Sequence, residues 1–540
     1  MESKNLILAF ALSMGVLLGW SWMFPPQQPV VSQETVPVAK ETLSADSALP
    51  DDMEISASPA IAPAQTSTQS NSPTSPQTSG TEVLATNTIE TFGNDLVTLS
   101  LNAKGWITDA KLSKYQLSLE DDTKVQMLST GDLHESYINS GVVGKKLVEP
   151  FKPVSIKKEN GKTIASFEGV LEGGVHWNRT YTLENGSYLI HAKDRLIGGA
   201  GNRLYRQIVE KNPETEGLDT INEHTGPIGL FQEKLTEVTY EELNESGAKK
   251  LAAMGGWTGI MSRYFISAIY GTEQLESYRY YYKGDGRSYQ AGIINDGVIE
   301  QSDMVFENNI YVGPKSIPLL EKAGVGLERS VDFGWFTIIA APLHQVMLWM
   351  NKYISNFGVI IILMVIAIKL ILFKPTQSAY RSMAAMRKLQ PEMAKLKERY
   401  GDDRQQMGQK VMDLYKKNKV NPLGGCLPIL MQMPIFFALY KVLLISIELR
   451  QAPFYGWIED MSVQDPWFIL PILMGVSMYI QMQLNPQPTD PIQAQVMKFL
   501  PIMMTGLFLF FPAGLVLYWV VNNILSIIQQ RLVMKSMNVD

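Results

Sequence analysis

Cysteine, histidine and charge are all scarce in this 540-residue chain. Its one cysteine, Cys426, excludes an intramolecular disulfide, and its five histidines are scattered, so we expect no structural zinc site. The net charge of −6 argues against direct nucleic-acid binding, because phosphate contacts need a basic surface. Charged residues make up only 19% of the chain against 46% hydrophobic residues, and the apolar runs gather at both ends. This segregation indicates an integral membrane protein with a large water-facing domain.

The first apolar run, Leu6–Phe24, is long enough to cross a bilayer core of about 30 Å as a helix. A cleaved signal peptide is the alternative, but Phe24 is followed by two prolines rather than by an A-x-A cleavage site. We therefore expect residues 1–24 to be an uncleaved anchor. Residues 25–88 hold 9 Pro and 19 Ser/Thr among 64 positions, which predicts a disordered linker, because such a segment buries too little apolar surface.

Residues 89–331 alternate mostly with a period of two, which predicts strands. Asn185-Gly186 lies between two alternating runs and is a strong hairpin signal, while Asn160-Gly161 and Gly284-Asp285-Gly286 suggest two more turns. Alternation along another strand is carried by Tyr278, Tyr280 and Tyr282. A domain of this length and pattern predicts a large all-β sandwich.

Motifs of catalysis are missing from the same domain. It contains no nucleophile elbow, Walker loop or GxGxxG sequence. Metal-ligand spacing is absent from His134, His176, His191 and His224. We expect no catalytic residue, metal or cofactor, and no enzyme activity, although a membrane-anchored periplasmic enzyme remains an alternative that predicts activity in the fragment 89–331.

Apolar segments dominate after residue 331. Residues 332–356 alternate apolar and polar side chains at helical spacing, which predicts an interfacial amphipathic helix. Five predicted membrane spans follow: Phe357–Phe373, Leu427–Ile447, Trp467–Gln483, Val496–Phe511 and Ala513–Ile528. The last two would measure about 45 Å or more as one helix, so we expect a tight hairpin at Pro512–Gly514 between two short helices. With the N-terminal run, the total is six transmembrane helices, five of which form the core.

The charge pattern predicts the topology. Residues 374–425 hold twelve Lys/Arg and five Asp/Glu, whereas Glu448–Pro466 holds one Arg and four acids. The positive-inside rule places residues 374–425 and both termini, including the tail 531–540, in the cytoplasm. The spans of residues 426–530 then return through the membrane, and the β-domain lies in the periplasm of a Gram-negative cell.

The basic segment 374–425 also reads as a helical hairpin. Apolar residues recur every three or four positions from Met383 to Tyr400, Gly401 ends that run, and Asp402 can cap the next helix. The hairpin either docks a partner or only connects two spans.

Polar side chains in the predicted spans fall on the cytoplasmic half, with the exception of Lys441, which we interpret as snorkelling outward. Lys369 lies near the inner end of its span and is a functional candidate by default, with snorkelling toward the interface as the alternative. On the last span one polar face is formed by Trp519, Asn522, Ser526 and Gln529. Polar side chains that reach only halfway through the membrane predict a water-filled cavity that is open to the cytoplasm and closed toward the periplasm. A transporter or channel, which would need polar lining through the full thickness, is the less favoured alternative.

The chain resembles the YidC/Oxa/Albino family of membrane protein insertases. The resemblance is carried by Val331–Trp335, Met383–Pro391, Asn421–Cys426, Gln432–Phe436, Glu448–Pro453, Leu470–Gly475 and Gly514–Tyr518. It implies insertion and folding of inner-membrane proteins, alone or beside the Sec translocon, without cofactor. It also implies a β-supersandwich in the periplasm. Expected partners are nascent membrane proteins, the Sec translocon, the ribosome, the signal-recognition-particle receptor and membrane lipids.

The resemblance also assigns roles to residues. Lys369 stands where the family usually has a groove Arg, which keeps the charge but loses bidentate pairing with a client carboxylate. Groove residues are expected at Lys369, Gln432, Gln481, Tyr518, Trp519, Asn522 and Ser526. A hydrophobic slide is expected at Met433, Pro434, Phe436, Phe508 and Phe510. Docking by the basic hairpin is expected through Arg387, Lys388, Lys395, Lys397 and Arg399.

Overall fold

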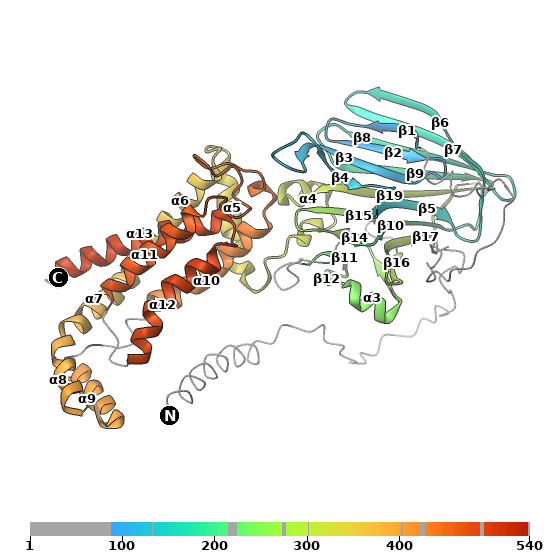
Figure 1. Ribbon diagram of the computed structural model, residues 1–540. Helices are drawn as coiled ribbons and strands as arrows, with labels where there is room; N and C mark the ends of the chain where they lie inside the picture. The colour runs from blue at the N-terminus through green and yellow to red at the C-terminus, as the bar shows by residue number, and fades with distance from the viewer. Residues whose placement is uncertain are drawn as a thin grey trace, which may run out of the picture. The chain divides into compact units, whose positions relative to one another are not determined.

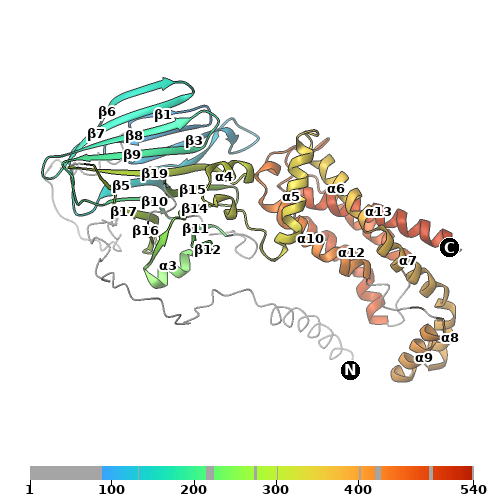
Figure 2. The same ribbon diagram turned by 180° about the vertical axis from the view of Figure 1, so that it is seen from behind.

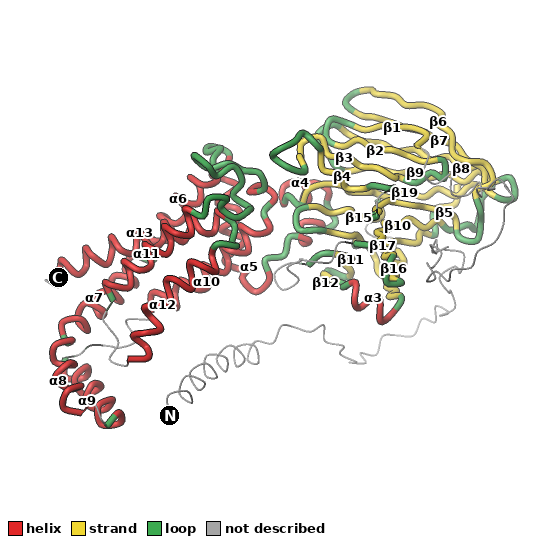
Figure 3. The backbone as a smooth tube through the Cα atoms, in the orientation of Figure 1, coloured by secondary structure: helices red, strands yellow, loops and turns green. Residues whose placement is uncertain are grey.

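The computed structural model describes residues 88–131, 133–213, 224–272, 277–300, 302–400, 403–418, 420, 427–485 and 491–537. The predicted N-terminal anchor and almost all of the predicted linker lie outside these residues. Strands occupy the first part of the described chain and long helices the second, as Figure 3 shows.

The first part is an all-β domain of two antiparallel sheets, as the sequence predicted (Figure 1). One sheet has the order β1-β2-β3-β5-β10-β17-β16-β13, with β4 on β3, and the other has the order β12-β11-β14-β15-β19-β9-β8-β7-β6, with β18 on β19. The strands are β1 (Thr88–Gly93), β2 (Val97–Asn102), β3 (Ile107–Gln116), β4 (Lys124–Leu128), β5 (Glu135–Val142), β6 (Leu147–Glu159), β7 (Lys162–Leu171), β8 (Val175–Glu184), β9 (Leu189–Ile197), β10 (Leu204–Lys211), β11 (Gly226–Phe231), β12 (Lys234–Glu237), β13 (Ala248–Met254), β14 (Trp257–Met261), β15 (Phe265–Gly271), β16 (Ser277–Gly284), β17 (Ser288–Asn295), β18 (Val298–Glu300) and β19 (Asp303–Pro314). Two short helices belong to the same domain, α3 (Tyr240–Ser246) and α4 (Ile317–Ala323).

The predicted hairpins form where the turn residues place them. β8 pairs with β9 across Asn185-Gly186, with Leu183 opposite Ile190. β6 pairs with β7 across Asn160-Gly161, and β16 pairs with β17 across Asp285 and Gly286. Gly161, Gly186 and Gly286 all have positive φ, the backbone conformation that these turns require.

The two sheets share one hydrophobic core. Phe92 of β1, in the first sheet, lies with its ring centroid 5.6 Å from the rings of both Phe167 and Tyr181 in the second sheet. On β16, Tyr278, Tyr280 and Tyr282 are buried as their alternation predicted, and Tyr281 on the opposite face is buried as well. Both faces of that strand are therefore covered.

The second part is a helical region. Its helices are α5 (Thr337–Asn351), α6 (Phe357–Ile371), α7 (Phe373–Lys388), α8 (Gln390–Tyr400), α9 (Arg404–Lys417), α10 (Leu427–Ile445), α11 (Ile469–Leu484), α12 (Pro491–Phe508) and α13 (Ala513–Ser536). α13 packs against α6 and α7 and also against α11, which packs in turn on α12, while α10 packs on α5 (Figures 1 and 2).

Among the described residues, one helix is long and apolar enough to cross a bilayer by itself, namely α13. α6 and α7 meet the same criterion together but are bent by 70° at their junction, and shorter apolar helices cover Met431–Ile445, Ile469–Leu484 and Ala494–Phe508. The bend follows from Pro375, which has no N–H to donate to the carbonyl of Ile371. One position further on, the Thr376 backbone N–H and hydroxyl both donate to the carbonyl of Leu372, at 3.1 and 2.7 Å.

Two helix predictions need correction. The chain breaks before Pro512 as predicted, but α13 is not short: it has 24 residues, which is about 36 Å of helix. The predicted continuous run from Met383 to Tyr400 is also wrong, because α7 ends at Lys388 and α8 begins at Gln390. Pro391 cannot donate to the carbonyl of Arg387, and the break at Leu389 lies where this hydrogen bond is missing.

The cap of α9 is likewise different from the prediction. Asp403 accepts a hydrogen bond from the backbone N–H of Gln406 at 3.0 Å, the geometry of a helix N-cap. The predicted cap, Asp402, lies outside the described residues. The hairpin nevertheless forms, since the Tyr415 hydroxyl of α9 donates to the Sδ atom of Met393 in α8 at 3.4 Å.

Candidate functional site

The site is centred on a lysine among apolar helices. The Nζ atom of Lys369, in the last turn of α6, donates to the Oγ atom of Ser526 on α13 at 2.8 Å. Ser526 is 2% exposed, and its hydroxyl donates to the carbonyl of Asn522 at 2.7 Å. The predicted groove residues Lys369, Asn522 and Ser526 therefore lie together.

The same face of α13 continues toward α7. Gln529 donates from Nε2 to the carbonyl of Phe373 at 3.3 Å, and Asn522 is buried with its Oδ1 atom lacking a hydrogen-bond partner among the described residues. Tyr380 of α7 also interacts with Ser526. A polar lining thus follows α13 along the side that meets α6 and α7.

A second polar face of α13 was not found from the sequence. Asn523 donates from Nδ2 to the Oγ atom of Ser477 on α11 at 3.1 Å. Gln530 donates from Nε2 to the carbonyl of Leu484 and to Oδ1 of Asn485, both at 3.1 Å. The separation of seven residues between Asn523 and Gln530 places both on one helix face, and this spacing was the available signal.

Aromatic residues join α10 and α12 to α13. The Trp519 ring centroid lies 4.8 Å from that of Phe436 on α10 and 5.3 Å from that of Phe508 on α12. Gln432 of α10 donates a hydrogen bond to the Tyr518 hydroxyl. The predicted groove residues Tyr518 and Trp519 therefore both contact α10, and Trp519 also contacts α12.

The predicted slide residues differ in exposure. Met433 and Pro434 are exposed on α10, and Phe510 is 78% exposed after α12, whereas Phe508 is 2% exposed. Exposed apolar side chains also follow α12 at helical spacing, at Phe499, Ile502, Met503 and Leu507. This exposed apolar face of α12 is suited to contact with lipid or with another apolar segment.

The remaining predicted residues lie farther from this centre. Gln481 is partly exposed on α11, and no hydrogen bond joins it to Lys369 or Ser526 in the described part of the chain. Lys388, Lys395, Lys397 and Arg399 are exposed. Arg387 is half-buried instead, and its Nη1 atom donates to the carbonyl of Leu484 at 3.4 Å.

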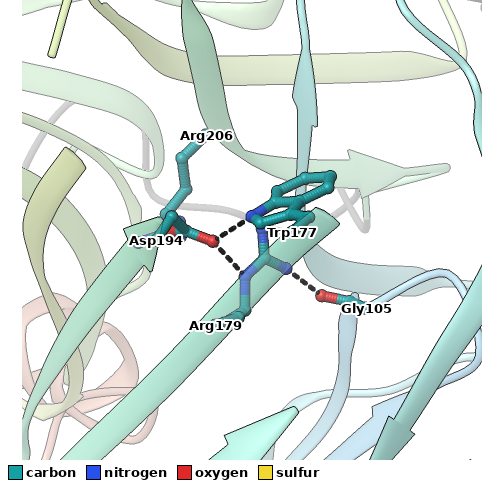
Figure 4. A network of polar contacts seen from close by, with 5 residues as sticks. All are labelled: Gly105, Trp177, Arg179, Asp194 and Arg206. Atoms are coloured by element: carbon teal, nitrogen blue, oxygen red, sulfur yellow. Dashed lines mark hydrogen bonds and ion pairs between the residues drawn. The ribbon is translucent and has the colours of Figure 1, made fainter. Parts of the chain in front are cut away.

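A buried charged cluster lies in the β-domain and is drawn in Figure 4. Arg179 and Trp177 donate to Oδ1 of Asp194 at 2.6 and 2.7 Å, and Arg206 donates to Oδ2 at 2.5 Å. Arg179 also donates to the carbonyl of Gly105 at 2.6 Å. Burial alone would raise the pKa of Asp194, but the two guanidinium groups outweigh burial and hold this pKa below its ordinary value.

This cluster serves the core rather than chemistry. Asp194, Arg179 and Arg206 are each 0% exposed, so no substrate can reach them. Across the described residues, no group of three His, Cys, Asp or Glu side chains is placed to hold a metal ion. The polar centre among the helices is therefore the stronger candidate site.

Two family models and the curated relatives point to one family. The family model described as "60Kd inner membrane protein" matches residues 349–540, and the model described as "YidC periplasmic domain" matches residues 90–346. The membrane protein insertase YidC of Magnetococcus marinus is 38% identical over 466 residues, which is 83% of this chain and 83% of that protein. The corresponding protein of Methylobacillus flagellatus is 36% identical over 554 residues, which is 99% of this chain and 98% of that protein. A crystal structure of an active YidC insertase, with its first transmembrane domain resolved, matches 81% of this chain and 91% of that one, at 18% identity and a TM-score of 0.39.

Proposed function

The chain belongs to the YidC family of membrane protein insertases, and from this premise we propose how its helical region acts on a client. The family works in the inner membrane, carries a periplasmic β-domain, and acts on nascent membrane proteins as an insertase rather than as an enzyme. The polar segment of a client enters beside Lys369 and Ser526 from the cytoplasm. The client's hydrophobic segment lies along the exposed apolar residues of α10 and α12.

The Lys369–Ser526 pair is the observation that supports this mechanism. A lysine within a bilayer costs about 2.5–3.5 kcal/mol on insertion scales, so its retention at this depth favours a functional role. Ser526 gives the ammonium group a neutral partner, and no ion pair joins Lys369 to a carboxylate within the described ranges. That charge attracts client carboxylates, while hydrophobic partitioning and the membrane potential supply the driving force.

The apolar half of the mechanism depends on α10 and α12. Phe436 and Phe508 both pack on Trp519, which fixes the two helices relative to the polar face of α13. Met433, Pro434 and Phe510 present apolar surface to the client helix before it leaves for lipid. Short helices beside this surface would thin the bilayer locally and shorten the path of the client's polar end.

The topology and the wider partners belong to the same proposal. Six spans, with residues 6–24 as the first, place both termini and α8–α9 in the cytoplasm. The exposed side chains of Lys388, Lys395, Lys397 and Arg399 then form a basic surface for the ribosome, the signal-recognition-particle receptor or the Sec translocon. Electrostatic docking of this kind weakens as salt is raised.

Insertion of a small single-span client into liposomes that contain only this protein tests the proposal. We expect wild type to insert the client and Lys369→Ala and Lys369→Glu to lower the inserted fraction about tenfold, because the attracting charge is lost or reversed. Lys374→Ala is the matched control, since Lys374 is exposed five residues further along.

Each other outcome changes the conclusion. Equal insertion by wild type and both Lys369 variants would discard the charge mechanism and leave hydration and thinning. If the folded wild-type protein inserts no client in liposomes that contain no translocon, the protein would instead be an assembly factor that acts only beside a translocon.

A further inference from the structure

Two adjacent basic residues at the end of α7 have different surroundings. Lys388 is exposed, whereas Arg387 is half-buried and donates from Nη1 to the carbonyl of Leu484, the last residue of α11. The contact spans 97 positions of the chain. Arg387 therefore joins two helices, while Lys388 faces outward.

The carbonyl of Leu484 is a group that needs a partner. The last four carbonyls of an α-helix have no intrahelical donor, and they form the negative end of the helix dipole. Here Gln530 of α13, which is 1% exposed, donates to the same carbonyl at 3.1 Å and to Oδ1 of Asn485 at 3.1 Å. A cation and a buried amide thus converge on the end of α11.

An apolar cluster lies at the same junction. Ala384 of α7 and Met534 of α13 are 2% and 6% exposed, and Leu484 and Met537 pack against them. Apolar packing and the two hydrogen bonds therefore hold the same three helices together. We call Arg387, Leu484 and Gln530 the three-helix clasp.

We propose that Arg387 is a positioning residue for the insertion site, because it pins the end of α11 to α7 and α13 and so holds the Lys369–Ser526 pair in place. This inference rests on the function proposed above. α13 lies against α11 on one side and against α6 and α7 on the other, so a loose end of α11 lets the inner half of α13 move away from Lys369. The role is internal, unlike the docking roles of its exposed basic neighbours.

The first test compares Arg387→Ala, Arg387→Lys, Lys388→Ala and Arg381→Ala in client insertion. In all three tests the native Cys426 is replaced by alanine, so that introduced cysteines are the only thiols. We expect Arg387→Ala to lower insertion about threefold to tenfold, because the long hydrogen bond to the carbonyl of Leu484 is lost, and Arg387→Lys to restore at least half of the lost insertion. Arg381→Ala, which changes an exposed arginine of α7 outside the proposed docking surface, should match wild type. Equal losses in Arg387→Ala and Lys388→Ala would assign both residues to a docking surface and overturn the proposal.

A second test asks whether a covalent link can replace the arginine. Arg387→Cys combined with Asn485→Cys removes the guanidinium, and a short bismaleimide then joins α7 to the end of α11. Positioning predicts low insertion before the link and recovery after it. A partner that reads the charge of Arg387 would gain nothing from the link, so continued loss in the linked protein rejects the positioning role.

A third readout does not depend on insertion. In a Leu484→Cys background, which keeps the backbone carbonyl, Arg387→Ala should raise the maleimide labelling rate of Cys at this half-buried site at least about threefold, because the end of α11 opens. Lys388→Ala should leave the rate unchanged. An unchanged rate in Arg387→Ala refutes the clasp even if wild type fails to insert clients, whereas a raised rate with a failed insertion assay removes only the proposed function.

Discussion

The ammonium group of Lys369 donates to the hydroxyl of Ser526 at 2.8 Å, and this hydroxyl in turn donates to the carbonyl of Asn522. The serine is therefore both acceptor and donor, and the lysine has a neutral partner instead of a carboxylate. A carboxylate at this place would neutralise the charge and remove its attraction for acidic client segments. A hydroxyl orients the ammonium group without cancelling it.

Ser526→Ala should lower client insertion about twofold to threefold, which is less than the loss in Lys369→Ala, because the charge remains and only its positioning is lost. Ser536→Ala is the matched control. Ser536 lies on the same helix and donates to the carbonyl of Val533 at 2.7 Å, but it is exposed. Equal losses in the two variants, measured in the liposome assay, would mean that Ser526 matters only for the helix.

Trp519→Ala should lower the free energy of unfolding by about 1–3 kcal/mol, because it removes aromatic contacts with both Phe436 and Phe508. Thermal unfolding in detergent measures this change. Tyr479→Ala on α11, where the side chain is 53% exposed, should change the melting temperature little. Similar shifts in both variants would show that Trp519 does not hold α10 and α12 together.

Gly475→Ala should destabilise the helical region by about 1–3 kcal/mol, because the added Cβ would overlap the hydroxyl of Thr505 on α12. Gly506→Ala on α12 is the matched control, since a Cβ there meets nothing within 4 Å. The helix propensity of alanine should leave that variant equal to wild type or more stable by up to about 1 kcal/mol. Thermal unfolding of the two variants side by side decides whether α11 and α12 pack as closely as the structure has them.

Asp194→Asn should destabilise the β-domain by about 3–5 kcal/mol, because Arg179 and Arg206 would stay buried without a counter-charge. The effect is measured by unfolding the full chain and using the proteolysis of the β-domain as the readout. Glu307→Gln is the control, since Glu307 pairs with Lys193 at the surface and such pairs contribute about 0–1 kcal/mol.

The pH dependence of the Asp194 contribution has a definite sign. The folded pKa of Asp194 lies below the ordinary value of 3.8, so its stabilisation is present above the unfolded pKa and is lost as the pH falls through the folded one. Wild type should therefore lose β-domain stability below about pH 4, whereas Asp194→Asn should lose less over that interval. An equal loss of β-domain stability at low pH in the two proteins would contradict this prediction.

Local chemistry explains what could be predicted from the sequence. Asn185-Gly186 and Asn160-Gly161 specify tight turns by themselves, so the hairpins β8–β9 and β6–β7 form where they were expected. The spacing of Asn522 and Ser526 places both on one face of α13, and that face meets Lys369. These features depend on residues close together in the chain or on a single helical period.

Features that depend on distant pairing could not be predicted in this way. The partners of Arg179 and Arg206 on Asp194 follow from the order of the strands, which alternation along one strand does not contain. Arg387 belongs to a basic run and has the sequence pattern of a solvated face. Only the approach of α11 to α7 shows that it turns inward, to a carbonyl that has no side-chain signal in the sequence.

The order of synthesis gives the Lys369–Ser526 pair one more consequence. The two residues are 157 positions apart, and a ribosome that adds roughly 5–20 residues per second needs roughly 8–30 s to pass from one to the other. For the later part of this interval the lysine has left the ribosome, but the helix that will pair with it is not yet complete. While it is being made, the protein therefore carries a lysine in an apolar helix whose hydrogen-bond partner has not yet been synthesised.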